Sequence, residues 1–484
     1  MQALLNELIT LVGSSNVLTE GDLSAWEQDW RKRTHGKALA VVRPGNTDEV
    51  AQVVRACARH LQQHPACGIS IVPQGGNTGL VVGSTPDASG RQIVLSLQRM
   101  NTVRAIDAAN LTITAEAGCI LQRVQESALA AGFLFPLSLA AEGSCTIGGN
   151  LGSNAGGTQV LRFGNARELC LGLEVVTPQG DIWHGLSGLR KDNTGYDLRH
   201  LYVGSEGTLG IITAATMKLY PLPAAQTTAW AAVPSMQAAV DLLGLAQRHL
   251  GAGLTGFEVM GRFALSLVAR HFANLHVPLF ADWPFCVLLE HSDHSSASHA
   301  RAQFEQLLEV ALAQGCVSDA VLAENLAQSK TLWQIRESIS LAQALEGPNI
   351  KHDISVPISS IPAFVQATDA LLQQAIPGVR LVNFGHLGDG NLHYNAQAPL
   401  GIDAAVFLRE QEPQVNRLVF DSVLQFGGSI SAEHGIGSLK VDHLAHYKSP
   451  VALQAMRAIK AALDPQNLLN PARVLAPIGT SELP

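Results

Sequence analysis

Three glycine-dense segments constrain most strongly what this chain can fold into. They are P-Q-G-G-N-T-G at residues 73–79, G-S-C-T-I-G-G-N-L-G-S-N-A-G-G at 143–157 and Y-V-G-S-E-G-T-L-G-I-I-T at 202–213. Backbone that is almost bare of side chains can approach a rigid ligand closely, and consecutive amides in such a loop can converge on a phosphate. Three such segments in one chain indicate contacts with an extended cofactor, longer than a mononucleotide.

The first two segments also have simpler interpretations. The first could be a plain glycine-rich turn, because it lacks both the G-K-[ST] of a Walker A loop and the G-x-G-x-x-G of a dinucleotide fingerprint. The second could be a flexible linker, but linkers are Ser/Gly repeats without apolar anchors. Ile147 and Leu151 lie within this segment, inside a strongly apolar region. Ligand contact is therefore the favoured interpretation of the second segment.

A histidine-containing hairpin is predicted from N-F-G-H-L-G-D-G-N-L-H-Y-N at residues 383–395. Asp, Gly and Asn suit a tight reversal, so His386 and His393 can lie on one face and point at the same atom. Further on, S-A-E-H-G-I-G places Glu433 and His434 among small residues. Two imidazoles and Glu433 would leave open metal positions for substrate, as catalytic sites do. The alternative is a glycine-rich hairpin with surface histidines, in a chain that holds 17 His.

Composition excludes several classes of protein. Apolar residues make up 47% of the 484 positions and charged residues 15%, which indicates well-packed globular domains, two or three at this length. A formal charge of −8 without a Lys/Arg run argues against nucleic-acid binding, and local cations must capture any anionic substrate. No apolar run is long enough to span a bilayer.

The expected location is cytoplasmic. The start, M-Q-A-L-L-N-E-L-I-T, lacks the basic region of a secretory signal. The seven cysteines are odd in number, contain no C-x-x-C and lie mostly in apolar or helical settings. We therefore expect free thiols in a reducing compartment.

The remaining pattern predicts two kinds of domain. We expect residues 1 to about 36 to be largely helical, a later helix capped by Thr47, and a hairpin at C-L-G-L-E-V-V-T-P-Q-G-D-I-W. The run Y-P-L-P-A-A at 220–225 is the best linker candidate. Beyond it strands and helices alternate, with helices at about 296–314 and 320–345, which indicates an α+β domain with an antiparallel sheet.

In five ordered motifs the chain resembles the FAD-linked D-2-hydroxyacid dehydrogenases. The motifs are P-Q-G-G-N-T-G, T-I-G-G-N-L-G-S-N-A-G-G, G-S-E-G-T-L-G-I-I-T, G-H-L-G-D-G-N-L-H and S-A-E-H-G-I-G. They are typical of the D-2-hydroxyglutarate and D-lactate dehydrogenase branch of the vanillyl-alcohol-oxidase flavoprotein superfamily, and the resemblance covers nearly the whole chain. It implies an α+β protein with an FAD-binding domain of two α/β subdomains (PCMH type) at residues 1–224, to which 465–484 return. A C-terminal FAD-linked-oxidase domain at 225–464, with an antiparallel sheet and helices, would bind substrate and metal.

The resemblance implies FAD as the cofactor and assigns its contacts. The pyrophosphate would be cradled by Pro73, Gly75, Gly76, Asn77, Thr78 and Gly79. The flavin would be lined by Gly143, Ser144, Gly148, Gly149, Asn150, Ser153, Asn154 and Gly157. The adenine and ribose half would lie near Glu206, Gly207, Ile211 and Ile212. Asn470 matches the family's closing N-P-G-K segment, in which Ala472 and Arg473 replace the usual Gly and Lys. The branch usually holds its flavin without a covalent link.

The resemblance also implies a metal and a substrate site. The residues implied to bind a divalent ion, generally zinc, are His386, His393 and Glu433, and the implied base is His434. The positions that match substrate-holding residues are Arg336, Ser340, Lys351 and Asn395, with Ser340 standing where Thr is commoner. Without the resemblance, Arg336 and Lys351 would be interpreted as a solvated helix face and a loop.

The implied reaction is flavin-dependent oxidation of a D-2-hydroxy acid to the 2-oxo acid, with hydride passing from C2 to flavin N5. The metal would orient the substrate and lower the pKa of its hydroxyl, and His434 would take the proton. Arg336 and Lys351 are more cations than a monocarboxylate needs, so D-2-hydroxyglutarate is expected ahead of D-lactate or glycolate.

Two other functional classes stay open at this point. An electron-transfer flavoprotein without substrate oxidation would be yellow and unbleached by any 2-hydroxy acid, whereas a metal hydrolase would be colourless and hold zinc. For a dehydrogenase, the implied partners are a small 2-hydroxy acid and an electron acceptor, such as electron-transfer flavoprotein or a quinone. Related enzymes are often dimers, so a homodimer is compatible with this interpretation.

Overall fold

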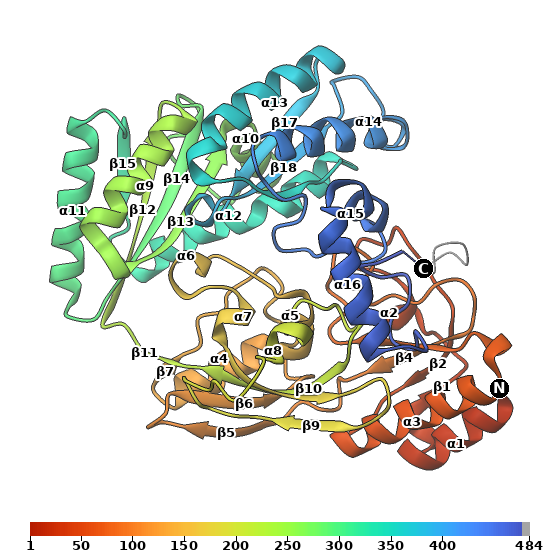
Figure 1. Cartoon of the computed structure of the whole chain (residues 1–484). Helices are drawn as coiled ribbons and strands as arrows, with labels where there is room; N and C mark the ends of the chain where they lie inside the picture. Colours follow the sequence, from red (N-terminus) through yellow and green to blue (C-terminus); the bar gives the residue numbers. More distant parts are fainter. Residues whose placement is uncertain (477–484) are drawn as a thin grey trace. The chain divides into compact units, whose positions relative to one another are not determined.

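The structure is a computed structural model that describes residues 1–476. These residues form two compact units, each built on its own sheets, and Figure 1 labels most of their helices and strands. Unit 1 contains Met1–Gly156, Gly164–Pro221 and residues 434–476, and unit 2 contains Gly157–Phe163 and Leu222–Glu433. Among the described residues, no helix combines the length and the apolar character needed to cross a bilayer.

The first sheet of unit 1 is parallel except at one edge. Its order is β1 (Val17–Leu18), β2 (Ala38–Val42), β4 (Gln92–Ser96) and β3 (Ser70–Gln74). β2, β4 and β3 run parallel, and β1 pairs antiparallel with β2. Short runs rich in Val and Ile suit parallel strands that are covered on both faces. In agreement, Val41, Ile71 and Val94 are fully buried.

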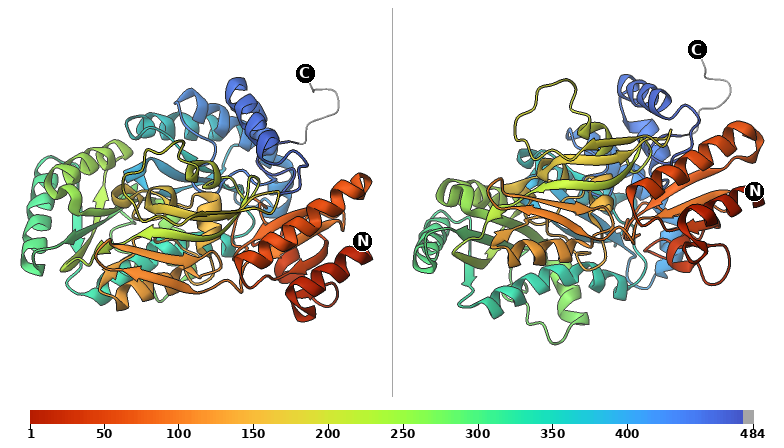
Figure 2. Two further views of the ribbon diagram at one scale, coloured as in Figure 1. Left: turned by 60° about the horizontal axis from the view of Figure 1, so that its bottom comes forward. Right: turned by 90° about the horizontal axis from the view of Figure 1, so that it is seen from below.

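Two helices pack on this sheet. α1 (Gln2–Val12) and α3 (Thr47–Gln63) lie side by side in every view (Figures 1 and 2). They share one apolar cluster with the sheet, to which Leu4, Leu8 and Val50 belong. The expectation that residues 1–36 are largely helical is wrong beyond α1, because only the short helices η1 (Ser14–Asn16) and α2 (Ser24–Glu27) follow it there.

The cap of α3 lies one residue earlier than predicted. Asn46, not Thr47, is the N-cap, and its side-chain oxygen accepts the N–H of Glu49 at 2.9 Å. The hydroxyl of Thr47 instead donates to the buried carboxylate of Glu174 at 2.6 Å. Asn and Thr both favour caps, so a tertiary contact decided between them.

The second sheet of unit 1 is antiparallel throughout. Its order is β5 (Val103–Asp107), β6 (Thr112–Glu116), β10 (Ile211–Lys218), β8 (Cys170–Val176) and β9 (Ile182–Gly185). β8 and β9 form the predicted hairpin, with Val176 opposite Ile182. Unit 1 also contains the helices α4 (Leu121–Ala130), α7 (Ala166–Leu169) and α8 (Arg199–Tyr202). The strands β7 (Phe133–Leu134) and β11 (Tyr220–Pro221) form a separate two-stranded antiparallel sheet.

The second glycine-dense segment contains a helix that sequence reasoning did not predict. This is α5 (Ile147–Ser153), and the Thr146 hydroxyl caps it by accepting the N–H of Gly149 at 3.4 Å. Glycine disfavours helices by about 1 kcal/mol per residue. A Cβ on Gly148, however, would lie 2.6 Å from the Cβ of Ala117, so close packing requires glycine there.

Unit 2 is built on one seven-stranded sheet whose pairs are all antiparallel, as predicted. Its order is β15 (Asp319–Leu322), β12 (Ala225–Val233), β14 (Phe285–Asp293), β13 (Leu254–Gly261), β17 (Arg380–Gly385), β18 (Asn391–Gln397) and β16 (Asp353–Ser355). The helix expected at 320–345 begins later, because its first residues form the edge strand β15.

Helices cover both faces of this sheet. On one face α10 (Arg262–His271) and α12 (Leu326–Glu346) enclose an apolar cluster with Trp230 and Leu288. Side chains alternate between the faces of a strand, and His291, three positions beyond Leu288, stacks on Phe304 of α11 (Ala297–Ala313) on the other face. Further helices are α6 (Val160–Phe163), α9 (Met236–Leu250), α13 (Ile361–Ala375) and α14 (Ala404–Gln425). These layers confirm the α+β class.

The chain rejoins unit 1 earlier than the expected residue 465. Contacts assign α15 (Val441–Tyr447) and α16 (Pro450–Leu463) to unit 1. Lys460 of α16 donates to the carbonyl of Thr208 at 2.8 Å, and such bonds fix the helix to the first unit. Residues 477–484 of the expected return lie outside the described residues.

The seven cysteines are free, as predicted. Most of them are buried among apolar side chains. Burial raises the pKa of the Cys57 and Cys170 thiols to about 12, so the reactive thiolate is disfavoured. These cysteines act as small apolar residues in the cores.

Candidate functional site

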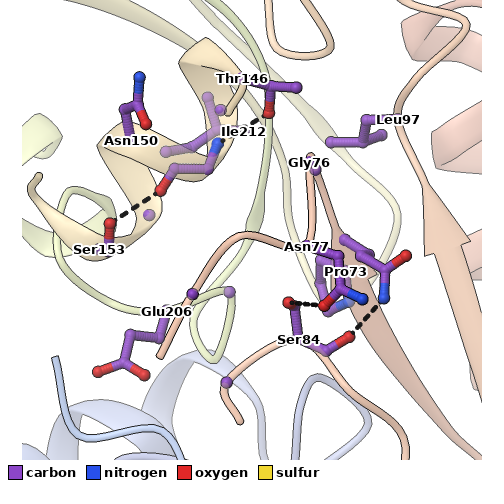
Figure 3. Close-up of a pocket in the computed structure, with 18 of the residues that line it drawn as sticks. Pro73, Gly76, Asn77, Ser84, Leu97, Thr146, Asn150, Ser153, Glu206 and Ile212 are labelled. Carbon is purple, nitrogen blue, oxygen red and sulfur yellow. Dashed lines mark hydrogen bonds between the residues drawn. The ribbon is translucent and has the colours of Figure 1, made fainter. Parts of the chain in front are cut away.

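Unit 1 contains a cavity of about 950 Å³, including the part open to solvent. Its walls come from the loop after β3, from α5 and the residues before it, and from the loop that leads into β10. Figure 3 shows Asn150 and Ser153 on one side of the cavity and Asn77 and Ser84 on the other. The three glycine-dense segments therefore meet at one place.

The backbone of residues 75–79 is shaped to bind an anion. Within the described chain, none of its five N–H groups donates a hydrogen bond to the protein. Asn77 has a left-handed φ of +54°, and its amide nitrogen donates to the carbonyl of Gln28 at 2.8 Å, which fixes the turn. Successive amides around a left-handed residue form an anion-binding concavity. A Cβ on Gly76 would overlap the carbonyl oxygen of Ser144, so the turn needs glycine.

Most residues predicted to bind the cofactor line this cavity. They are Pro73, Gly75, Gly76, Asn77, Thr78, Gly79, Gly148, Gly149, Asn150, Ser153, Glu206, Gly207, Ile211 and Ile212. Five predicted residues are not part of the lining: Gly143, Ser144, Asn154, Gly157 and Asn470. The oxygen of the Asn154 amide accepts the N–H of Arg167 at 3.0 Å, and the Asn470 amide donates to the carbonyls of Gly83 and Glu206 at 2.9 and 2.8 Å. These two asparagines hold the walls in place.

Sequence reasoning missed part of the lining. The missed residues are Gln74, Val81, Gly83, Ser84, Leu97, Cys145, Thr146, Gly152, Tyr202, Ser205 and Gly210. Most of them adjoin the predicted glycines, and the local density of small residues could have identified them. Leu97 has no such signal, because only the fold brings it to the cavity. His434, predicted as the base, also lines this cavity.

Unit 2 brings His386, His393 and Glu433 together, here called the His–His–Glu cluster. One ligand atom of each residue lies within 4.8 Å of the other two. Nε2 of His386 is 3.4 Å from Oε1 of Glu433, and the two imidazole centroids are 5.6 Å apart. Ligand atoms bound at ~2.1 Å to a tetrahedral ion are spaced roughly 3.4 Å apart. The cluster therefore has the dimensions of a divalent-cation site.

The β17–β18 hairpin creates this geometry. His393 on β18 lies opposite Phe384 on β17, and His386 follows β17 directly. The turn is the short helix η5 (Leu387–Asp389), which ends at Gly390 with φ +85°. Aspartate and glycine at this reversal thus place both imidazoles on one side of the hairpin.

Glu258 on β13 links the cluster to Arg336. Its Oε1 lies 2.6 Å from Nδ1 of His386, and its Oε2 accepts Nε of Arg336 at 2.7 Å. Burial disfavours ionisation of Glu258, but Arg336 and His386 outweigh burial and lower its pKa to about 2. A carboxylate bound to Nδ1 leaves Nε2 of His386 as the ligand nitrogen, the usual arrangement around metal-binding histidines.

Negative charge is crowded around the cluster. Burial, together with Asp353 and Asp389, raises the pKa of Glu433 to about 7, and burial raises the pKa of Asp389 to about 6. Burial opposes protonation of His386, but Glu258 and Glu433 raise its pKa to about 9. Asp353 also accepts the backbone N–H of Glu433 at 2.8 Å. The donor set and its excess of carboxylates fit a divalent cation.

Two of the predicted substrate residues lie on α12. Arg336 is 7% exposed, its Nη2 lies 3.4 Å from Nδ1 of His386, and its guanidinium stacks over Phe384 at 5.3 Å. The guanidinium is thus beside the cluster but already paired with Glu258. Ser340, one turn later on α12, is exposed.

The other two lie near β16 and on β18. Lys351 is half-buried and precedes β16 by two positions. Asn395 is buried; its amide donates to Gln343 at 3.0 Å and accepts the N–H of His352 at 2.9 Å. Asn395 therefore braces β18 against α12, a role that the sequence alone did not indicate.

Comparisons with known proteins identify the families to which two parts of the chain belong. Residues 38–185 match the family described as FAD binding domain, and residues 222–474 match the family described as FAD linked oxidases, C-terminal domain. A D-2-hydroxyglutarate dehydrogenase from Xanthomonas citri pv. viticola is 40% identical over 455 residues, or 94% of this chain and 92% of that protein. A D-2-hydroxyglutarate dehydrogenase from Stutzerimonas stutzeri is 36% identical over 477 residues, which cover 98% of this chain and 99% of that protein. The mitochondrial D-2-hydroxyglutarate dehydrogenase from Bos taurus is 37% identical over 478 residues, which cover 95% of this chain and 84% of that protein.

Solved structures share the fold. p-Cresol methylhydroxylase with bound substrate has a TM-score of 0.75 at 16% identity, over 98% of this chain and 96% of that one. 4-Ethylphenol oxidase from Gulosibacter chungangensis, in an isoeugenol complex, has a TM-score of 0.73 at 17% identity, over 98% and 97%. At such low identity these structures support the architecture alone.

Proposed function

The chain belongs to the family of FAD-linked oxidases and is an FAD-dependent oxidoreductase acting on CH–OH donors, and we propose that its substrate is D-2-hydroxyglutarate, oxidised to the 2-oxo acid. The observation that carries the proposal is the His–His–Glu cluster with Arg336 beside it. Relatives named D-2-hydroxyglutarate dehydrogenase, 36–40% identical over nearly the whole chain, support this choice.

The cavity of unit 1 fits FAD. Its amides at residues 75–79, which have no acceptor in the described protein, would bind the pyrophosphate, and α5 would line the flavin. FAD, when bound, accepts the hydride that leaves C2 of the substrate. The glycine-dense walls leave room for a flat ring system against the backbone.

The His–His–Glu cluster fits a divalent cation, and we propose zinc. Nε2 of His386, the His393 imidazole and the Glu433 carboxylate would hold it. Such an ion, when bound, lowers the pKa of a coordinated hydroxyl and fixes its orientation. Glu258 contacts Nδ1 of His386 and would thereby leave Nε2 available to bind the ion.

His434 is proposed to take the proton of the substrate hydroxyl on an imidazole nitrogen, which is a suitable base near neutral pH. It is the residue after Glu433, so the two Cα atoms are about 3.8 Å apart. Arg336 forms an ion pair with Glu258, which offsets its positive charge. We assign Lys351, which the resemblance matches to a substrate-holding position, to the distal carboxylate that distinguishes a dicarboxylate from lactate.

A substrate panel with a dye acceptor tests the proposal. We expect kcat/KM for D-2-hydroxyglutarate to exceed that for D-lactate and glycolate by about 10- to 100-fold, the effect of one charge-assisted hydrogen bond. Lys351→Met should remove most of this preference, whereas Lys330→Met, at an exposed position of α12, should keep it. A higher kcat/KM for D-lactate would replace the proposed substrate with the D-lactate alternative.

The visible spectrum separates the other two classes. A bound flavin that D-2-hydroxyglutarate bleaches supports the dehydrogenase. An unbleached flavin would favour an electron-transfer flavoprotein, and a colourless zinc protein would favour a hydrolase. An electron-transfer flavoprotein or quinone acceptor, a homodimer and a cytoplasmic location stay predictions.

A further inference from the structure

The carboxylate of Glu206 is bonded to the loop that carries His434. Its Oε1 accepts the N–H of Ile436 and its Oε2 accepts the N–H of Gly437, both at 2.7 Å. The resemblance had placed Glu206 beside the adenine and ribose half of the cofactor. Glu206 lines the cavity, but both of its carboxylate oxygens accept hydrogen bonds from the protein. This pairing suggests a second role.

The surroundings are shaped to fit this carboxylate. A Cβ on Gly435, which has φ +80°, would lie 2.6 Å from Oε1 of Glu206, and a Cβ on Gly83 would lie 3.2 Å from Oε2. Glu206 itself has φ +52°, a left-handed conformation that is unfavourable for a residue with a side chain. The Asn470 amide holds the Glu206 carbonyl at 2.8 Å and fixes that conformation.

Burial disfavours the charged form of the Glu206 carboxyl. It raises the pKa of the Glu206 carboxyl, and the two amides of Ile436 and Gly437 oppose that shift by binding the charged form. A buried carboxylate is retained only where its hydrogen bonds are satisfied. The bonds to the loop are therefore the main stabilisation of the charged side chain, and they stabilise the loop in return.

We propose that Glu206 is a positioning residue that fixes the loop at residues 434–437 and, through it, holds the His434 imidazole at the cavity wall. This inference rests on the proposed function, in which His434 takes the hydroxyl proton. Glu206 itself touches neither the proton nor the hydride. Its effect on the reaction passes through the two backbone amides of the loop.

Glu206→Gln tests the inference, because glutamine offers one acceptor oxygen and turns an NH₂ group towards the other amide. We expect the rate of flavin reduction at saturating D-2-hydroxyglutarate to fall about 10- to 100-fold, with less than about a threefold change in KM. Flavin content per chain should stay constant. The matched control is Glu174→Gln, a buried carboxylate of unit 1 that accepts hydrogen bonds from Thr47 and Thr213. It should reduce the rate by less than about twofold.

A double-mutant cycle shows whether the effect passes through His434. If it does, Glu206→Gln combined with His434→Asn should be no slower than His434→Asn alone. Additive losses, or a fast Glu206→Gln enzyme beside a slow His434→Asn enzyme, would overturn the inference. An unimpaired His434→Asn enzyme would instead overturn the proposed role of His434.

Hydrogen exchange tests the loop without any turnover. The amides of Ile436 and Gly437 should exchange at least about tenfold faster in Glu206→Gln than in the wild-type or Glu174→Gln proteins. Gly435→Ala disturbs the same contact from the loop side and should have the same effect, which covers the case that Glu206→Gln folds poorly. Unchanged exchange in both variants would show that Glu206 does not fix the loop.

Discussion

Glu258 and His386 are 128 positions apart in the sequence, yet Oε1 of Glu258 lies 2.6 Å from Nδ1 of His386. The same carboxylate binds Arg336 through its other oxygen. One buried residue thus sets the orientation of an imidazole in the His–His–Glu cluster and balances a buried guanidinium. This relationship suggests that metal affinity depends on a residue that is not itself a ligand.

Glu258→Gln should lower zinc affinity about 10- to 100-fold, because the amide no longer holds Nδ1 of His386 as a carboxylate does. Competition with a chelator measures the affinity, and flavin content should not change. The matched control is Glu290→Gln on the neighbouring strand β14, where Thr255 and Trp333 bind the carboxylate at 2.9 and 3.0 Å. Equal losses in the two variants would show that the effect is general to buried carboxylates.

Glu433→Gln should release the metal while keeping the volume of the side chain. It removes the only formal negative charge among the three proposed ligands, so we expect metal content to fall by at least about tenfold. Elemental analysis of purified protein measures this. The control is His299→Ala. His299 lies on α11, is half-exposed and contacts Asp293 of β14, so this variant should retain the metal. Full metal content in Glu433→Gln would exclude this carboxylate as a ligand.

Gly76→Ala and Gly79→Ala should differ in their effect on folding. A Cβ at Gly76 would overlap the carbonyl oxygen of Ser144, so the backbone must shift, and we expect a loss of about 1–3 kcal/mol in unfolding free energy. A Cβ at Gly79 would meet no protein atom within 4 Å. Gly79→Ala should therefore keep the stability of the FAD-free protein. Its FAD affinity, measured by fluorescence titration, should fall only if the ligand fills that space. Equal stability of the two variants would contradict the packing at Gly76.

Local patterns predicted much of the architecture. The alternation of strands and helices after residue 225, the β8–β9 hairpin and the β17–β18 hairpin all follow from periodicity and turn residues. The glycine-dense segments meet at one cavity, as expected of contacts with a single ligand. Helix propensity failed at α5, where packing against Ala117 requires Gly148 whatever its intrinsic helix preference.

Side-chain contacts between residues far apart in the sequence could not be predicted in the site. No pattern near Glu258 or Glu206 indicates that one binds His386 and the other the loop of His434, since each contact joins segments more than a hundred positions apart. Asn395 and Asn470 were predicted as ligand contacts, but their amides bind protein groups. Polar residues in a binding motif can serve the ligand or the walls, and the sequence does not distinguish these roles.

The pH dependence of unit 2 should include a contribution from Glu346 at the end of α12. Arg380 and Arg270 donate to its carboxylate at 2.5 and 2.9 Å, and His271 contacts it at 3.0 Å. Burial alone would raise its pKa, but these partners lower it to about 2. The folded state therefore binds fewer protons than the unfolded state between pH ~2 and ~4.5, and stability falls as pH falls through this window.

The size of that contribution is about 3–4 kcal/mol, from a difference of roughly 2.5 pKa units at about 1.4 kcal/mol each. Glu346→Gln should therefore be less stable than the wild-type protein by about this amount at pH 7. The difference should shrink as the pH falls below about 4.5 and approach zero only at and below about pH 2, where the carboxylate of the folded wild-type protein becomes protonated. Urea denaturation followed by fluorescence at several pH values measures it. Glu305→Gln, in the exposed pair with Arg301 on α11, should change stability by less than about 1 kcal/mol at any pH. If the difference in unfolding free energy between Glu346→Gln and the wild-type protein stayed constant with pH, the charge of Glu346 would not be the source of its stabilisation. Packing of the side chain would then stabilise the end of α12.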